Sequence, residues 1–344
     1  MKDTSNLPQL LLSTIRQAQE GKIFNQSVWQ NPIDKVLKNE FLFFIKPEIT
    51  LPSQTIQLEP IVQLILKKMK EFGFSIHHIR TLSSDYLKQF DLIDQHYQVI
   101  AEVSNQGLSA MNTKSRQVFK EMYGENPENV TVLGGVQFLE KYPFFNALSL
   151  DCLWQNFENS KLSGGTYVEK IRIDKETIYL LNGFHPKQLQ HFYEKGRSIV
   201  VFRLSSNLSW KQARQCFVGS TVPSKAEKGS IRHELLDNKN AFGLEEVSQS
   251  FNGVHLSAGP VEALVELRRF DSDATMEQHC SSAMDFSFGK KLKDVFGCIP
   301  EMLLKNQKIE FNDKKISIFD LTEELDADEA LNLIKTSLIK QVNC

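Results

Sequence analysis

The order of strand-like and helical segments limits the fold of this chain more than any other feature. Short runs rich in β-branched and aromatic residues, such as FLFFI at 41–45 and SIVVFRL at 198–204, predict buried strands. Segments with apolar residues at helical spacing alternate with them, such as QLEPIVQLILKKMKEFGF at 57–74. The order is strand, helix, strand, helix, insertion, helix, strand, helix, loop, strand and helix. It predicts an α+β fold with a split β-α-β pattern on an antiparallel sheet and helices to one side.

The amino-acid composition changes along the chain, and these changes separate a main region from several additions. A chain of 344 residues is long enough for about two domains. The loop-rich residues 98–183 include YVEKIRIDKETIYLLNG, two alternating runs around DKE that predict a hairpin. We therefore expect a main domain at 41–97 and 184–270, an inserted subdomain at 98–183, an N-terminal helical extension at 1–40 and a C-terminal extension at 271–344.

Charge, histidine and cysteine patterns argue against several classes of protein. The net charge of −2 disfavours a protein that coats nucleic acid or an anionic membrane. No segment reaches the ~18–20 apolar residues of a membrane span, and the N-terminus predicts no cleaved signal. His77 and His78 are neighbours in a predicted strand and point to opposite faces, so they are poor joint ligands. The five scattered cysteines predict reduced thiols, no zinc site and a cytoplasmic location.

One histidine lies in a segment whose neighbours suggest chemistry. The sequence NGVHLSAGPVEALVE places Asn252 three residues before His255 and Ser257 two residues after it. Glu266 follows on a helical run. A lone histidine at the end of a strand supports little by itself, so its role depends on the rest of the chain.

A second group of residues has the chemistry to bind phosphate. The chain has no GxxxxGK[ST] sequence and therefore no P-loop. Lys46 ends a predicted strand, while Arg214, Thr221 and Arg232 lie in a polar segment that Pro223 and a later glycine mark as a loop. Arginine binds phosphate through paired N–H groups, and lysine adds a compact charge. The competing interpretation is that these are solvated surface bases.

In order and spacing, these segments resemble the nucleoside diphosphate kinases. FLFFIKPE resembles the family's first strand, KKMKEFGFSI the stretch after it, and SIVVFRL its central strand. ARQCFVGSTVPSKAEKGSIRHEL resembles GR…GxTxPxxxxPGTIR, and NGVHLSAGPVEALVE resembles NxxHGSDSxExAxxE. DQHYQVI and GFHPKQLQHF resemble the segments with the family's active-site tyrosine and base-stacking aromatic, here Tyr97 and Phe184. The resemblance covers 41–97 and 184–270 and implies a ferredoxin-like sheet.

The resemblance implies a phosphotransferase. It would move the γ-phosphate of ATP, or of another nucleoside triphosphate, to a nucleoside diphosphate through a phosphohistidine at His255. Glu266 would fix the tautomer of that histidine, and Ser257 would hold its surroundings. Mg²⁺ would be carried by the nucleotide phosphates, with no metal site in the protein. A homo-oligomer is left open, and neither a membrane nor a nucleic acid is expected as a partner.

Nucleotide contacts are implied by the same resemblance. Charge on the phosphates would be offset by the lysine and the two arginines, and the base would stack on the phenylalanine. The residues assigned to nucleotide binding are Lys46, Tyr97, Phe184, Arg214, Thr221, Arg232 and Asn252.

Two departures from the family pattern lie directly beside the histidine. Leu256 stands where the family has a small residue, and Ala258 replaces the acid of GSD. These changes and the added segments favour an alternative, a nucleotide-binding or protein-interaction module on the same fold with weak or no kinase activity. Another phosphoryl or nucleotidyl transfer on the same scaffold is the remaining alternative.

Overall fold

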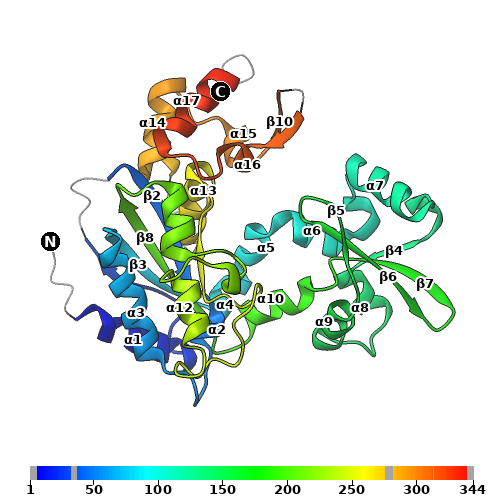
Figure 1. The fold of residues 1–344 in the computed structure, drawn as a ribbon, viewed down its shortest axis with the longest axis horizontal. Helices are drawn as coiled ribbons and strands as arrows, with labels where there is room; N and C mark the ends of the chain where they lie inside the picture. Colours follow the sequence, from blue (N-terminus) through cyan, green and yellow to red (C-terminus); the bar gives the residue numbers. More distant parts are fainter. Residues whose placement is uncertain (1–5, 32–36, 276–281, 313, 339–344) are drawn as a thin grey trace. The chain divides into compact units, whose positions relative to one another are not determined.

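The chain forms two compact units in the computed structural model (Figure 1). The first unit contains Met1–Tyr86 and Lys195–Cys344, and the second contains Leu87–Glu194. The inserted subdomain expected at 98–183 lies within the second unit. The structure describes residues 6–31, 37–275, 282–312 and 314–338.

The first unit is built on a five-stranded sheet in which every neighbouring pair is antiparallel. In spatial order the strands are β1 (Asn25–Gln30), β3 (Ser75–Ser83), β8 (Ser198–Ser206), β2 (Asn39–Ile45) and β9 (Val254–Leu256). Its helices up to residue 270 are α1 (Leu7–Gln19), α2 (Pro47–Thr50), α3 (Leu58–Glu71), α4 (Ser84–Gln89), α11 (Trp210–Gln212), the π-helix η3 (Ala213–Val218), η4 (Pro223–Lys225), α12 (Ile231–Asp237) and α13 (Pro260–Phe270). This architecture confirms the α+β class and the antiparallel sheet.

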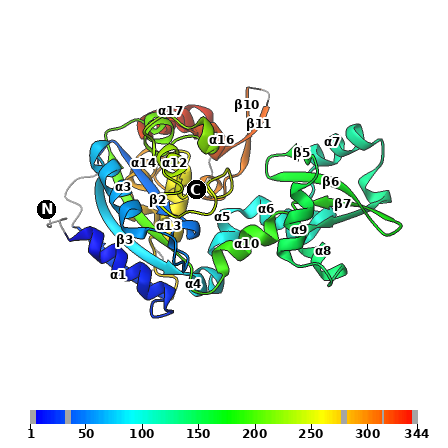
Figure 2. The same ribbon diagram turned by 60° about the horizontal axis from the view of Figure 1, so that its bottom comes forward.

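Helices cover both faces of this sheet (Figures 1 and 2). Phe43 of β2 joins a buried cluster that includes apolar residues of α1 and α3. The next residue, Phe44, points to the opposite face, where its ring centroid lies 5.7 Å from that of Phe270 on α13. The prediction of helices on one side is therefore wrong. Because β2 is apolar on both faces, each face must be buried.

The N-terminal prediction also needs a correction. Residues 1–40 contain α1, but they also contain β1, which pairs with β3 at the edge of the sheet. The residues of β1, NQSVWQ, are partly exposed, and apolar and polar residues do not alternate regularly along the strand. Its extended conformation is therefore stabilised by pairing with β3, which local sequence patterns do not report.

The C-terminal extension packs on the first unit around α13. Its helices α14, α15, α16 and α17 contact α13, and β10 and β11 pair as antiparallel strands. The elements of this extension are η5 (Ala283–Asp285), α14 (Ser287–Phe296), α15 (Glu301–Leu304), β10 (Lys308–Phe311), β11 (Lys314–Ser317), α16 (Ile318–Thr322) and α17 (Ala327–Leu338).

The second unit has its own four-stranded sheet in the order β4-β7-β6-β5. The predicted hairpin is confirmed as β6 (Thr166–Ile173) and β7 (Glu176–Leu181), and two buried clusters pack around these strands. The remaining elements are α5 (Leu92–His96), α6 (Gln98–Gln106), η1 (Gly107–Ala110), α7 (Thr113–Tyr123), η2 (Pro127–Asn129), β4 (Thr131–Gly134), α8 (Gly135–Lys141), α9 (Ala147–Gln155), β5 (Ser160–Ser163) and α10 (His185–Tyr193).

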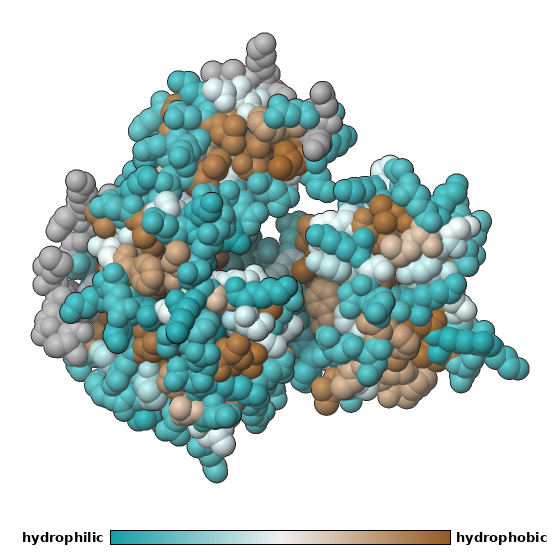
Figure 3. Space-filling model, viewed as in Figure 1, coloured by the Kyte–Doolittle hydropathy of each residue, from teal (hydrophilic) through white to brown (hydrophobic). Residues whose placement is uncertain are grey.

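On the face shown in Figure 3, hydrophobic residues form separate patches among hydrophilic ones. Among the described residues, no helix has the length and apolar character needed to cross a membrane. Cys152 and Cys216 are free thiols, as expected. The expectation of reduced thiols is wrong for Cys298, which is disulfide-bonded.

Candidate functional site

His255 lies in β9, the edge strand beside β2. The antiparallel register sets His255 opposite Phe44. Strand alternation sends Val254 and Leu256 into the buried cluster on one face and His255 to the other. The His255 ring stacks on Phe44 with centroids 4.5 Å apart and an interplanar angle of 22°, and its side chain is 18% exposed. The sheet edge therefore fixes the ring without burying it completely.

A carboxylate on α13 fixes the orientation of the ring. Nε2 of His255 lies 3.0 and 3.1 Å from the two carboxylate oxygens of Glu266. The hydroxyl of Ser257 donates to the same carboxylate at 2.5 Å, while the Ser257 backbone N–H donates to the carbonyl of Leu42 at 3.2 Å. Glu266 is 1% exposed and Ser257 is fully buried. Because an ionised carboxylate only accepts hydrogen bonds, this pairing places the proton of a neutral His255 on Nε2.

A second carboxylate lies one helical turn before Glu266. Glu262 accepts a hydrogen bond from the backbone N–H of Ala258. Burial, followed by the charge of Glu266, raises the pKa of Glu262 to about 8. The Ala258 carbonyl accepts from the backbone N–H of Glu324 at 2.9 Å. The turn after His255 is thus held on both sides, and Glu262 supplies an acid near the position where the family pattern has one.

Lys46 is buried beside the loop that leads to His255. It is 8% exposed, and its backbone N–H donates to the carbonyl of Gly253 at 2.9 Å. The backbone N–H of Gly253 donates to the carboxylate of Glu48 at 2.8 Å. Burial lowers the pKa of Lys46; Glu48 opposes this shift and Arg232 adds to it. The lysine therefore lies where an anion would offset the cost of burying its charge.

Arg232 lies on α12, which corrects the prediction that its segment is a loop. Ile231 and Leu235 are fully buried one helical turn apart, so this short segment has an apolar helical face that the loop signals obscured. The Arg232 guanidinium donates to the carbonyls of Gly219 and Val254, both at 2.9 Å. It therefore connects the polar segment to the strand that carries the histidine.

Asn252, which precedes β9, also connects this strand to the polar segment. It is 1% exposed, and its Nδ2 donates to the carbonyls of Thr221 at 3.2 Å and Gln249 at 3.0 Å. The side-chain oxygen of Asn252 is buried and has no hydrogen-bond partner within the described part of the chain. Thr221 itself is exposed. A buried acceptor of this kind is a group that a bound ligand or water would satisfy.

Arg214 is paired with acidic residues of the C-terminal extension. It lies on the π-helix η3, in the segment SWKQARQCFV, whose sequence predicts a helix. The guanidinium forms an ion pair with Glu323 and lies 3.7 Å from a carboxylate oxygen of Glu324. Both acids lie between α16 and α17, and Glu324 is also the residue whose backbone N–H donates to the Ala258 carbonyl. Sequence patterns do not reveal this contact, because the partners lie 109 positions apart in the chain.

Tyr97 and Phe184 belong to the second unit, where both contact its own aromatic residues. Tyr97 lies between α5 and α6, with its ring centroid 6.4 Å from that of Phe192. The Phe184 ring centroid lies 5.7 Å from that of Trp154 and 6.0 Å from that of Tyr167. Phe184 therefore packs at the edge of that unit's core, and stacking on a base stays a prediction.

Within the first unit, the structure brings together most of the residues expected at the site. The chain of contacts joins His255, Ser257 and Glu266 directly, and Lys46, Arg232 and Asn252 through the backbone around β9. Their roles stay predictions. Sequence reasoning missed Glu262, whose spacing of four from Glu266 on one helix was the available signal, and it missed the acids that pair with Arg214.

No family model matches the chain. Two solved structures are similar to it. A nucleoside diphosphate kinase from Encephalitozoon cuniculi, in its apo form, is 12% identical over 72% of this chain and 96% of its own, with a TM-score of 0.33. An NDP kinase from Pyrobaculum aerophilum is 18% identical over 71% of this chain and 99% of its own, with a TM-score of 0.34. TM-scores this low establish no common fold, so the function must be argued from the residues of the site.

Proposed function

We propose that the protein is a nucleoside diphosphate kinase-like phosphotransferase. It moves the γ-phosphate of a nucleoside triphosphate such as ATP to a nucleoside diphosphate, with His255 as the phosphorylated residue. The observation that supports this most is the hydrogen-bonded group formed by His255, Glu266 and Ser257. A histidine oriented by a buried carboxylate has the arrangement of an activated nucleophile.

The tautomer of His255 determines which ring nitrogen attacks the phosphate. With the proton on Nε2 directed at Glu266, the lone pair of the neutral His255 ring is on Nδ1. Nδ1 attacks the γ-phosphorus, the bond from phosphorus to the β,γ-bridging oxygen breaks, and the nucleoside diphosphate leaves. Glu266 stabilises the positive charge that develops on the ring and keeps its hydrogen bond to Nε2–H. A second nucleoside diphosphate then attacks the phosphohistidine, and the lone pair returns to Nδ1.

The cationic residues supply charge for this reaction. Lys46 is buried near the backbone of β9, and Arg232 contacts the carbonyl of Val254 directly before His255. Positioned cations of this kind stabilise a transferring phosphoryl group. Asn252 offers its buried side-chain oxygen to a ligand hydroxyl. Thr221 is a further nucleotide contact in this proposal, while the assignment of Tyr97 and Phe184 rests on the family resemblance alone.

Magnesium enters the proposal with the nucleotide. Each carboxylate near His255 already accepts a hydrogen bond: Glu266 from Ser257, Glu262 from Ala258 and Glu48 from Gly253. Carboxylates that are engaged in this way fit an Mg²⁺ that is bound by phosphate oxygens and water rather than by a protein cage. When bound, the ion would neutralise phosphate charge.

The proposal includes a ferredoxin-like arrangement of the first unit, a cytoplasmic location and assembly as a homo-oligomer. The antiparallel strand order β3-β8-β2-β9 supports the first of these. The free thiols of Cys152 and Cys216 support the second, and the disulfide-bonded Cys298 opposes it. Homo-oligomer formation is carried over from the family resemblance alone.

One observation favours a second function, a nucleotide-binding or protein-interaction module without transfer. Arg214, which the reaction would use on phosphate, is already paired with Glu323 and lies close to Glu324. If that ion pair persists when nucleotide binds, the site lacks one of its cations. The two functions differ in a single measurable step, the formation of phosphohistidine.

Incubation with γ-labelled ATP and Mg²⁺ tests the proposal. The expected product carries acid-labile, base-stable label on His255, and His255→Ala abolishes both the label and transfer to a nucleoside diphosphate. His233→Ala is the matched control, because this partly buried histidine lies on α12 in the same unit. Nucleotide binding without label would support the module instead, and transfer by His255→Ala at the normal rate would refute the proposal.

A further inference from the structure

A second hydrogen-bonded group in the first unit has the arrangement of a nucleophile, a base and an orienting acid. Oγ of Ser27 lies 2.7 Å from Nε2 of His78. Nδ1 of the same ring lies 2.6 Å from Oδ1 of Asp271. Each ring nitrogen therefore has one partner, with the hydroxyl on Nε2 and the carboxylate on Nδ1. This is the order of contacts in a Ser-His-Asp triad.

The exposure of the three residues suits those roles. Ser27 lies on the edge strand β1 and is exposed to solvent. His78 lies on the neighbouring strand β3, with a side chain that is 15% exposed, and Asp271 directly follows α13 with a side chain that is 6% exposed. A nucleophile must be reached by substrate, whereas the orienting acid acts best when it is buried. Exposure falls in that order here.

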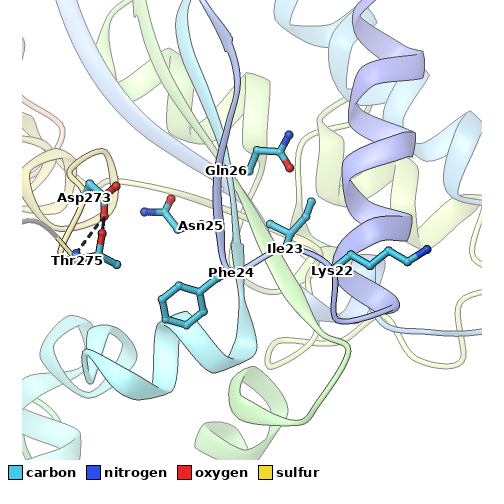
Figure 4. A pocket seen from close by; sticks show the side chains of 7 residues that line it. All are labelled: Lys22, Ile23, Phe24, Asn25, Gln26, Asp273 and Thr275. Carbon is cyan, nitrogen blue, oxygen red and sulfur yellow. Dashed lines mark hydrogen bonds between the residues drawn. The ribbon is translucent and has the colours of Figure 1, made fainter.

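A pocket lies next to the serine. It has a volume of about 330 Å³ and is lined by Lys22, Ile23, Phe24, Asn25, Gln26, Asp273 and Thr275 (Figure 4). Asn25 and Gln26 directly precede Ser27, and Asp273 is two residues beyond Asp271. In Figure 4, Asn25 extends from β1 toward Asp273 and Thr275. The lining includes none of Ser27, His78 and Asp271; it is connected to them through the preceding residues of β1 and through the segment after α13.

We propose that Ser27, His78 and Asp271 form a second catalytic site, separate from His255, that hydrolyses carboxylic esters with a short acyl group. Ser27 Oγ attacks the ester carbonyl carbon while His78 Nε2 accepts the hydroxyl proton. The carbon–oxygen bond to the alcohol breaks, and the alcohol leaves with that proton. Water then attacks the acyl-serine by the same route and releases the acid. Asp271 positions His78 and stabilises its charged form.

The local backbone offers a donor for the oxyanion. The register between β1 and β3 pairs Ser27 with Arg80 and Trp29 with Ile79, so Val28 has no partner residue at this bulge. A bulge frees a backbone amide from the ladder, and the N–H that follows a nucleophile is a common oxyanion donor. The limited volume of the neighbouring pocket, about 330 Å³, is the reason for expecting a short acyl group.

A fluorophosphonate probe and p-nitrophenyl acetate test this site on the full-length protein. We expect the probe to modify Ser27, identified by peptide mass spectrometry, and the ester to be hydrolysed. Ser27→Ala should abolish both, while Ser53→Ala, at another exposed serine of the same unit, should change neither. His255→Ala should also leave both intact, which separates this activity from phosphotransfer.

Ester kinetics of a variant test the role of Asp271 separately. Asp271→Asn should lower kcat for the ester at least about tenfold and leave KM unchanged, because the acid orients the base and does not contact substrate. Thermal unfolding checks that the variant is folded, since Asp271 also lies 3.9 Å from Arg203. An unmodified Ser27, or labelling of folded Asp271→Asn at the normal rate, would mean that these contacts are only structural.

Discussion

Replacing Glu266 with glutamine tests the proposed phosphotransfer at its most specific contact. The carboxylate accepts hydrogen bonds from both His255 and Ser257. Glutamine has the same shape but only one oxygen acceptor, and its amide group donates. Oε2 of Glu266 accepts from both partners, at 3.1 Å from Nε2 of His255 and 2.5 Å from Oγ of Ser257, so a glutamine oxygen in that position keeps both hydrogen bonds. The negative charge that faces the ring disappears in either orientation of the amide.

The expected effect follows from the strength of that contact. A hydrogen bond to a charged group contributes about 1.5–3 kcal/mol. Positive charge develops on His255 only as its bond to phosphorus forms, so most of the loss falls on the transition state. At about 1.4 kcal/mol per factor of ten, Glu266→Gln should slow phosphorylation roughly 10- to 100-fold.

Single-turnover phosphorylation at saturating labelled ATP measures this rate, and thermal unfolding is recorded in parallel. Glu40→Gln is the matched control, because Glu40 is also buried and accepts from Arg203 at 2.7 Å, on the same sheet but in a different set of contacts. It should lower the melting temperature and leave the phosphorylation rate of the folded protein within about threefold. A normal rate in Glu266→Gln, or equal losses in both variants, would contradict the reasoning.

Three further predictions concern the groups around this contact. Arg232→Lys cannot keep both bonds to backbone carbonyls, so it should lower stability by about 1 kcal/mol and phosphorylation about tenfold or more, measured by thermal unfolding and single turnover. Glu323→Gln weakens the ion pair to Arg214, so the KM for ATP should fall a few-fold; an unchanged KM would show that this arginine does not bind nucleotide. Glu262 has a folded-state pKa of about 8 against an ordinary value of 4.5. Protonation of Glu262 therefore stabilises the folded state at low pH. This contribution to the free energy of unfolding is lost as pH rises from about 4.5 through 8. The melting temperature should decline across that range, and less so in Glu262→Gln.

Local sequence determined the part of the site whose residues lie close together along the chain. The spacing from His255 to Glu266 requires only a strand end, a short turn and a helix that begins at Pro260. Alternation in β9 and periodicity in α13 then set which side chains share a face. The resemblance to the family pattern implied the role of Glu266, and its short separation from His255 along the chain makes their contact depend little on the rest of the fold.

Loop signals were less informative, because they report backbone preference and not burial. The glycine and proline around Arg232 predicted a loop, but the fully buried Ile231 and Leu235 stabilise a short helix there. The same limit applies to β1, whose strand depends on hydrogen bonds to β3. Tertiary contacts overrode local preference in both places.

The contacts that only tertiary structure decided join segments far apart in the chain. Arg214 meets Glu323 across 109 residues, and His78 meets Asp271 across 193. A charged or polar side chain has many partners of suitable chemistry along a sequence, and no periodicity selects among them. Selection comes from the packing of α13 on the sheet and of α16 on α13, which fixes the distances between these groups once apolar surface is buried. The sequence by itself therefore determined the residues on each element and the local pair at His255, while the fold decided which remote acids lie beside Arg214 and His78.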